Sequence, residues 1–195
     1  MARTLKIGVL SFHGDVEEHV VAINKAAQNL RIEIEVVLVR TKDTLHSLDA
    51  LIIPGGESTT LQKLCEREGM FAGIKNINKI FGTCAGAILL AKTVRNKEKD
   101  QRTLELMDIE VDRNAYGKQA ESFEEAIDTT LGKMKAIFIR APKITATRNG
   151  VSVLAKNGNS VFACEQKNGD KYYLATCFHP ELTTTLFHEY FLKQI

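Results

Sequence analysis

Short apolar runs alternate with amphipathic segments through the first half of the chain. Strand-like runs rich in β-branched residues lie at 5–10, 32–39, 50–53 and 79–81. Apolar residues recur at helical spacing from Asp15, the expected N-cap, to Leu30, and again from about Ser58 to Glu68, with a shorter helix expected after Gly69. This alternation predicts a three-layer α/β fold with a mostly parallel central sheet and helices on both faces.

The second half of the chain has a different pattern. Shorter strands are expected at 109–111, 136–139, 151–154, 161–164 and 172–178. Asn157-Gly158-Asn159 and Asn168-Gly169-Asp170 are strong hairpin signals, so this part is expected to extend the sheet with antiparallel strands. The polar stretch 95–102 reads as a loop and 182–192 as a final helix. Without a linker or internal repeat, residues 1–195 are expected to form a single domain.

Composition narrows the class of protein only slightly. The 195 residues contain 44% hydrophobic and 26% charged residues, as in a typical soluble domain. The net charge of +2, with scattered basic residues, gives no indication of a nucleic acid or a membrane as partner. The cysteines lack the spacing of a zinc site, so no metal is expected. Three of them are expected in the core, and unpaired thiols indicate a reducing cytoplasm.

One cysteine stands between a strand and a helix. Gly82-Thr83-Cys84-Ala85-Gly86 follows the strand ending at Phe81 and precedes the apolar run 87–91. Small residues two positions away on either side suit the tight turn of a nucleophile elbow, with sulfur in place of the serine hydroxyl. The start of a helix also favours a thiolate. The alternative is a buried structural cysteine, because free cysteine is among the most buried residue types.

A thiol nucleophile needs a base, and the base needs a group that orients it. Phe178-His179-Pro180-Glu181 follows a predicted strand. On an extended segment, residues two apart point to the same side, so His179 could take the thiol proton while Glu181 holds the imidazole. The alternative is a surface histidine beside a helix-capping glutamate.

A glycine-rich loop follows the strand at 50–53. Gly55 and Gly56 leave backbone N–H groups accessible, and Ser58 or Thr59 could cap the next helix. Such donors can stabilise a tetrahedral oxyanion, although a plain turn into a capped helix would look the same. Loop, elbow and histidine pair all fall at predicted strand ends. Together they predict acyl transfer through a thioester, with Cys84 attacking a carbonyl carbon.

The motifs GTCAG, FHPE and PGGEST resemble those of class I, triad-type glutamine amidotransferases. Within that class, the chain resembles the glutaminase subunits of pyridoxal 5′-phosphate synthase from about Lys6 to Phe191. The segments that carry this closer resemblance are 7–10 followed by Gly14-Asp15, 113–117, 119 with 121–124, 138–142 and 178–183.

The resemblance implies a class I glutamine amidotransferase fold and hydrolysis of L-glutamine to glutamate and ammonia, without a cofactor. It further implies a hetero-oligomer, in which ammonia passes through a tunnel to a separate synthase subunit that forms pyridoxal 5′-phosphate. Carried over by position, Cys84 is the nucleophile, and His179 and Glu181 complete the triad. Glutamine would be held by Gly55, Gly56, Glu57, Ser58, Arg113, Ile139 and Arg140.

The chemistry of a free amino acid agrees with these assignments. An arginine can clamp an α-carboxylate in a bidentate fashion, and an α-ammonium group requires a carboxylate or carbonyls. Without the resemblance, Arg113 and Arg140 would be read as ordinary surface arginines. The sequence also indicates little activity before the synthase binds, because an uncontrolled glutaminase would waste glutamine.

Two positions depart from the family pattern. Phe12-His13-Gly14 stands where Leu-Gln-Gly is usual, which leaves His13 either as a loop histidine facing solvent or as a residue with a catalytic role. Lys118 replaces an arginine, so the charge is kept but the planar fork is lost. The competing interpretations are a PfpI-like amidase, the glutaminase of a different amidotransferase, and a regulatory binding subunit that has lost catalysis.

Overall fold

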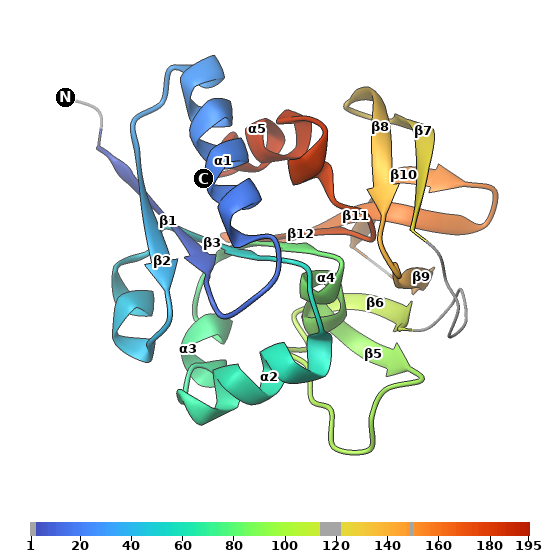
Figure 1. Cartoon of the computed structure of the whole chain (residues 1–195), viewed down its shortest axis with the longest axis horizontal. Helices are drawn as coiled ribbons and strands as arrows, with labels where there is room; N and C mark the ends of the chain where they lie inside the picture. The colour runs from blue at the N-terminus through green and yellow to red at the C-terminus, as the bar shows by residue number, and fades with distance from the viewer. Residues whose placement is uncertain (1–2, 114–121, 149) are drawn as a thin grey trace.

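A mixed sheet forms the centre of the fold, with strands in the order β2-β1-β3-β4-β12-β11-β10-β7-β8 (Figure 1). This computed structural model describes residues 3–113, 122–148 and 150–195. The parallel half comprises β1 (Leu5–Leu10), β2 (Ile34–Val39), β3 (Ala50–Ile53), β4 (Lys79–Thr83) and β12 (Lys171–Thr176). β3 is buried along its whole length, which explains its uninterrupted apolar sequence. The predicted parallel sheet is confirmed.

Helices cover both faces of the parallel half (Figure 1). On one side lie α1 (Val16–Leu30) and α5 (Leu186–Leu192), which contact each other. On the other side lie α2 (Ser58–Arg67), α3 (Phe71–Lys75) and α4 (Ala85–Leu90). Two 3₁₀ turns connect these elements: η1 (Lys42–Ser47) lies between β2 and β3, and η2 (Pro180–Leu182) lies between β12 and α5. The expected three-layer arrangement is confirmed.

The final helix is shorter than the sequence pattern predicts. A continuous helix over 182–192 was expected, but the chain forms η2 and then α5, which begins only at Leu186. Threonines lie at this break, and the hydroxyl of one of them bonds to a nearby backbone N–H in place of the helical pattern. Thr184 Oγ1 accepts the N–H of Leu186 at 3.2 Å.

The antiparallel extension contains more strands than expected. On the main strand path it contains β7 (Phe123–Thr129), β8 (Gly132–Phe138), β10 (Val151–Asn157) and β11 (Ser160–Asn168). Off this path lie β5 (Ala91–Arg95), β6 (Met107–Asp112) and β9 (Lys143–Thr147), where β6 pairs with β9 antiparallel and with β5 parallel. The sequence analysis missed β5, β7 and β9, whose residues are largely polar because one side faces solvent. Both predicted hairpins are present, with Gly158 at φ 55° and Gly169 at φ 58° in their turns.

The carboxyl ends of four parallel strands bring separate loops together. β1 leads to the loop before α1, β3 to the glycine loop, β4 to Cys84 and β12 to His179. Open α/β sheets commonly place their ligand sites at this edge. No helix within the described parts of the chain is long and apolar enough to cross a membrane.

Candidate active site

Cys84 lies at a strained turn between β4 and α4. Its φ of 49° and ψ of −102° are uncommon for a residue with a side chain, and such strain costs of order 1–3 kcal/mol and collects at functional sites. The Cys84 N–H donates to Thr176 O at 2.8 Å, which ties the turn to β12. Gly82 and Gly86 flank this turn, and there is no room for a side chain at either position. A Cβ on Gly86 would lie 2.1 Å from Ile53 O, and one on Gly82 would lie 2.6 Å from the Gly86 carbonyl carbon.

His179 and Glu181 form the expected pair. The backbone N–H of His179 donates to Ile137 O at 2.9 Å, and the imidazole Nδ1 lies 2.8 Å from Glu181 Oε1. An extended conformation was predicted for residues 178–181, but Pro180 begins η2 and places Glu181 within this turn. The Glu181 side chain nevertheless reaches the ring, and both side chains are buried.

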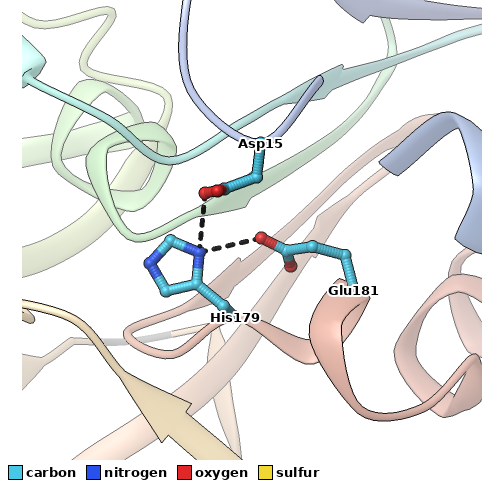
Figure 2. Close-up of side chains that lie close together, drawn as sticks. All are labelled: Asp15, His179 and Glu181. Atoms are coloured by element: carbon cyan, nitrogen blue, oxygen red, sulfur yellow. Dashed lines mark hydrogen bonds and ion pairs between the residues drawn. The ribbon is translucent and has the colours of Figure 1, made fainter. Parts of the chain in front are cut away.

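A second carboxylate contacts the same ring nitrogen. Asp15 Oδ2 lies 3.0 Å from His179 Nδ1, and it approaches this nitrogen from a different direction than Glu181 (Figure 2). The sequence analysis assigned Asp15 to the N-cap of α1. Asp15 does hold that position, but its side chain makes no capping hydrogen bond and turns to His179 instead. Its role beside the histidine was missed because the two residues are far apart in the sequence.

The pKa values of Asp15, His179 and Glu181 are shifted in different directions by their surroundings. Burial lowers the pKa of His179, but the contacts with Asp15 and Glu181 and the nearby Cys84 side chain outweigh burial and raise the pKa well above its usual 6.5. The hydrogen bond to His179 lowers the pKa of Asp15, which is partly exposed. Burial raises the pKa of Glu181 despite its contact with His179. His179 Nε2 makes no hydrogen bond within the described residues and is the ring nitrogen left for the thiol.

Two buried histidines stand behind Glu181. His19 Nε2 lies 3.4 Å from Glu181 Oε1 and 3.0 Å from Thr83 Oγ1, and His19 Nδ1 lies 2.9 Å from His188 Nε2. Burial lowers the pKa of His19 well below its usual value and that of His188 to about 3, so both rings are neutral.

The available hydrogen-bond partners determine the tautomers of His19 and His188. His188 Nδ1 has no partner within the described residues. A buried N–H without an acceptor is rarer than an unused lone pair, so His188 donates its Nε2–H to His19. His19 then donates its own Nε2–H to Thr83 Oγ1, and Glu181 Oε1 lies 3.4 Å from the same nitrogen. The sequence carried one usable signal: His19 lies one helical turn after Asp15, on the same face of α1.

A cavity of about 310 Å³ opens beside Cys84. Eight of the residues predicted for the site line it: Gly56, Glu57, Ser58, Cys84, Arg113, Ile139, Arg140 and His179. The structure adds Gly14, Asp15, Ile88 and Pro142 to this lining. Gly55 lies against the imidazole, and Glu181 lies behind it. A larger surface groove, of about 670 Å³, runs along α1 and β2 and contains none of the predicted site residues.

Glu57 links the glycine loop to Arg113. Its carboxylate accepts the N–H groups of Thr59 at 3.0 Å and Thr60 at 2.6 Å, and Arg113 Nη2 donates to it at 2.6 Å. The prediction that Ser58 or Thr59 caps α2 is wrong. Glu57 caps this helix, because its carboxylate can accept both N–H groups at once, and the Ser58 hydroxyl accepts a hydrogen bond from Gln101 instead. Burial raises the pKa of Glu57, but these hydrogen bonds and the Arg113 charge lower it to about 2.

The remaining predicted residues lie around the cavity as follows. Ile139 O lies 3.9 Å from Cys84 Sγ, and Arg140 follows in a left-handed conformation with φ 43°. His13 was expected either to face solvent or to act in catalysis; it is half-buried, and its ring occupies the space beside Gly56, where an added Cβ would lie 2.5 Å from Nδ1. Lys118 lies outside the described residues.

Asp15, His179 and Glu181 are also the group of described residues whose ligand atoms lie close enough together, within 4.8 Å, to consider a metal ion. Their separations of 2.8 and 3.0 Å from Nδ1 are those of hydrogen bonds between the side chains themselves. The cluster is therefore described as an imidazole held by two carboxylates.

Comparisons with known proteins agree with this geometry. The model of the SNO glutamine amidotransferase family matches residues 9–195. The chain is 41% identical to the pyridoxal 5′-phosphate synthase subunit PdxT of Thermococcus onnurineus, covering 97% of this chain and 98% of the relative. It is 43% identical to the PdxT subunit of Archaeoglobus fulgidus, again over 97% and 98%. A solved glutamine amidotransferase superposes with a TM-score of 0.81 at 40% identity, covering 96% of this chain and 97% of the other. The chain belongs to the SNO glutamine amidotransferase family.

Proposed function

We propose that this chain is the glutaminase subunit of a pyridoxal 5′-phosphate synthase, and that it hydrolyses L-glutamine to L-glutamate and ammonia at Cys84. The observation that carries the proposal is the convergence of a strained cysteine and a carboxylate-held histidine on one cavity lined by two arginines. Membership of the amidotransferase family supplies the reaction class.

The reaction follows from the proposed roles of three residues. His179 Nε2 takes the proton of Cys84, and the thiolate attacks the side-chain amide carbon of glutamine. The resulting tetrahedral oxyanion accepts hydrogen bonds from backbone N–H groups of the Gly55-Gly56 loop. When the C–N bond breaks, the imidazolium gives its proton to the departing ammonia and a glutamyl thioester remains. Water, deprotonated by His179, then attacks the thioester and releases glutamate and the thiol. Glu181 stabilises the charged imidazole in both steps.

The cavity offers the charges that a free amino acid requires. Arg113 and Arg140 provide guanidinium groups for the α-carboxylate, and Glu57 and Ile139 O provide acceptors for the α-ammonium group. Arg113 is already anchored through Glu57, so its guanidinium is held in place at the rim. Gly56 and Ser58 complete the proposed binding surface, which involves no cofactor.

We infer that a separate synthase subunit uses the ammonia. The residues proposed for glutamine hydrolysis extend from the β3 loop to η2, and the family match spans residues 9–195, so the described fold is occupied by the glutaminase itself. The relatives are named as subunits of pyridoxal 5′-phosphate synthase. We infer a hetero-oligomer in which ammonia travels through a tunnel to the synthase subunit. The four free, buried cysteines favour a reducing compartment such as the cytoplasm.

Ammonia release from glutamine, measured with and without the synthase subunit, tests this function. We expect slow release by the free subunit and a clear increase with the synthase. The Cys84→Ala variant should release no ammonia in either case while retaining its circular dichroism spectrum and synthase binding. Equal rates with and without synthase would refute activation by the partner, and turnover by Cys84→Ala would refute the mechanism.

A further inference from the structure

Asp15 occupies a helix-capping position without capping the helix. Aspartate is favoured at an N-cap because its carboxylate accepts the free N–H groups of the first turn. Here that carboxylate makes no such bond, and it lies 3.0 Å from His179 Nδ1 instead. The helix-capping function predicted from the sequence therefore does not account for this side chain.

The contact is built into the surrounding backbone. Gly55 lies beside both partners: a Cβ there would approach His179 Cε1 to 2.4 Å and Asp15 Oδ2 to 3.0 Å. Gly14 has φ 89°, and a Cβ on it would lie 2.0 Å from Gly55 O. Two glycines thus allow the loop before α1 to approach the β3 loop closely. Figure 2 shows the Asp15 carboxylate directed at the imidazole.

We propose that Asp15 is a second positioning residue for the proposed base, accepting the Nδ1–H of His179 together with Glu181 and holding the imidazolium oriented toward Cys84. This inference rests on the glutaminase function proposed above. Nδ1–H is shared between two acceptors, and the ring cannot turn without losing both.

The two carboxylates differ in how readily they carry charge. The Glu181 side chain is fully buried, and burial opposes its ionised form. The Asp15 side chain is 28% exposed, so solvent stabilises its charge while it remains in contact with the ring. Asp15 is therefore the more firmly ionised partner of the imidazolium, whereas Glu181, in hydrogen-bond contact with Nδ1 at 2.8 Å, fixes the ring's direction. The other charged or titratable groups near His179 are Cys84 on the elbow and His19 on α1.

Titration of His179 by nuclear magnetic resonance tests this proposal without glutamine. The Cys84→Ala background removes the sulfur, so the carboxylates remain the acidic groups beside His179. Asp15→Asn in this background keeps the side-chain shape and the capping ability but removes the charge. We expect the titration midpoint of His179 to fall by about one pH unit. Asp15→Glu should restore part of the shift, and the exposed hairpin variant Asp170→Asn should cause none.

Catalysis provides the second measurement, with Cys84 intact and the synthase present. In Asp15→Asn, the alkaline limb of kcat/KM should move to lower pH by about one unit, because the imidazolium that protonates ammonia is lost sooner. A change in melting temperature alone, with an unchanged His179 midpoint and alkaline limb, would overturn the role of Asp15. A wild-type protein that releases no ammonia would instead refute the proposed function, and the His179 titration would still decide the role of Asp15.

Discussion

At the scale of residues, the four cysteines have different surroundings. Burial raises the pKa of Cys65 and of Cys177 to about 12 and raises that of Cys164 further, so these thiols are held neutral. Cys84 lines the cavity and faces an imidazole. The environment of each sulfur thus separates one candidate nucleophile from three core residues.

The two carboxylates on His179 are expected to compensate for each other. Glu181→Gln should lower kcat by less than the roughly 10⁴-fold seen when the carboxylate of an isolated triad is replaced, because Asp15 still accepts Nδ1–H. The Asp15→Asn/Glu181→Gln double variant should lose more activity than the product of the single losses. Steady-state kinetics with synthase measures all four forms. Strictly multiplicative losses would mean that the two side chains act independently.

Local motifs allowed Cys84, His179 and Glu181 to be predicted from the sequence, because each lies in a short segment with a recognisable chemical pattern. The supporting residues could not be found in this way. His19 contacts His188 across 169 positions in the chain, and only folding brings α1 against α5. The predicted N-cap position of Asp15 is confirmed, but its contact with His179 was not predicted because the start of a helix supplied a sufficient local explanation.

At the scale of elements, the elbow depends on glycine at two positions. Gly86→Ala places a Cβ 2.1 Å from the Ile53 carbonyl oxygen, which belongs to the backbone of β3 and cannot move freely. We expect a loss of about 1–3 kcal/mol in the free energy of unfolding, as for other overpacked sites, together with slower alkylation of Cys84. Urea denaturation and thiol labelling measure these effects.

Gly158→Ala provides the control for the elbow variant. Gly158 lies in the hairpin turn at φ 55° with no atom within 4 Å of an added Cβ. The substitution should destabilise the fold by about 1–2 kcal/mol through backbone strain alone and leave the alkylation rate of Cys84 unchanged. If Gly86→Ala matched this control in both measurements, the close approach of α4 to β3 would not matter for the elbow.

The cap of α2 is expected to make stability depend on pH. The pKa of Glu57 is about 2 in the fold, against an ordinary value of 4.5. Its ionised form therefore stabilises the protein fully above about pH 4.5, and this contribution is lost as the pH falls toward 2. Glu57→Gln should flatten that part of the stability curve, whereas the exposed Glu33→Gln should not. Urea unfolding between pH 2 and 6 tests this, and identical slopes would exclude Glu57 as a source.

Sequence patterns predicted the parallel strands well because burial on both faces leaves an uninterrupted apolar run, as in β3. Strands with one solvent-facing side were harder to recognise. β7 has the sequence FEEAIDT, in which only Ile127 is buried, and no strand was predicted there. Pairing with β8 makes it a strand, and that long-range choice is not visible within the segment.

At the scale of the whole molecule, we infer that the chain folds as one domain. A single path of hydrogen-bonded strands runs from β2 through the parallel half to β8. Because β12 joins the parallel and antiparallel halves, neither half has a complete sheet without it. Differential scanning calorimetry should show one cooperative transition, and two separable transitions would contradict the single-domain assignment.

Cys84 is proposed to form a thioester with the glutamyl group of the substrate. Labelling with an electrophilic analogue of glutamine, followed by peptide mass spectrometry, tests it most directly when glutamine is added as a competitor. We predict a single adduct on Cys84 that glutamine prevents and that His179→Ala slows strongly. An adduct on Cys65, Cys164 or Cys177, or labelling of Cys84 that glutamine does not affect, would contradict the account.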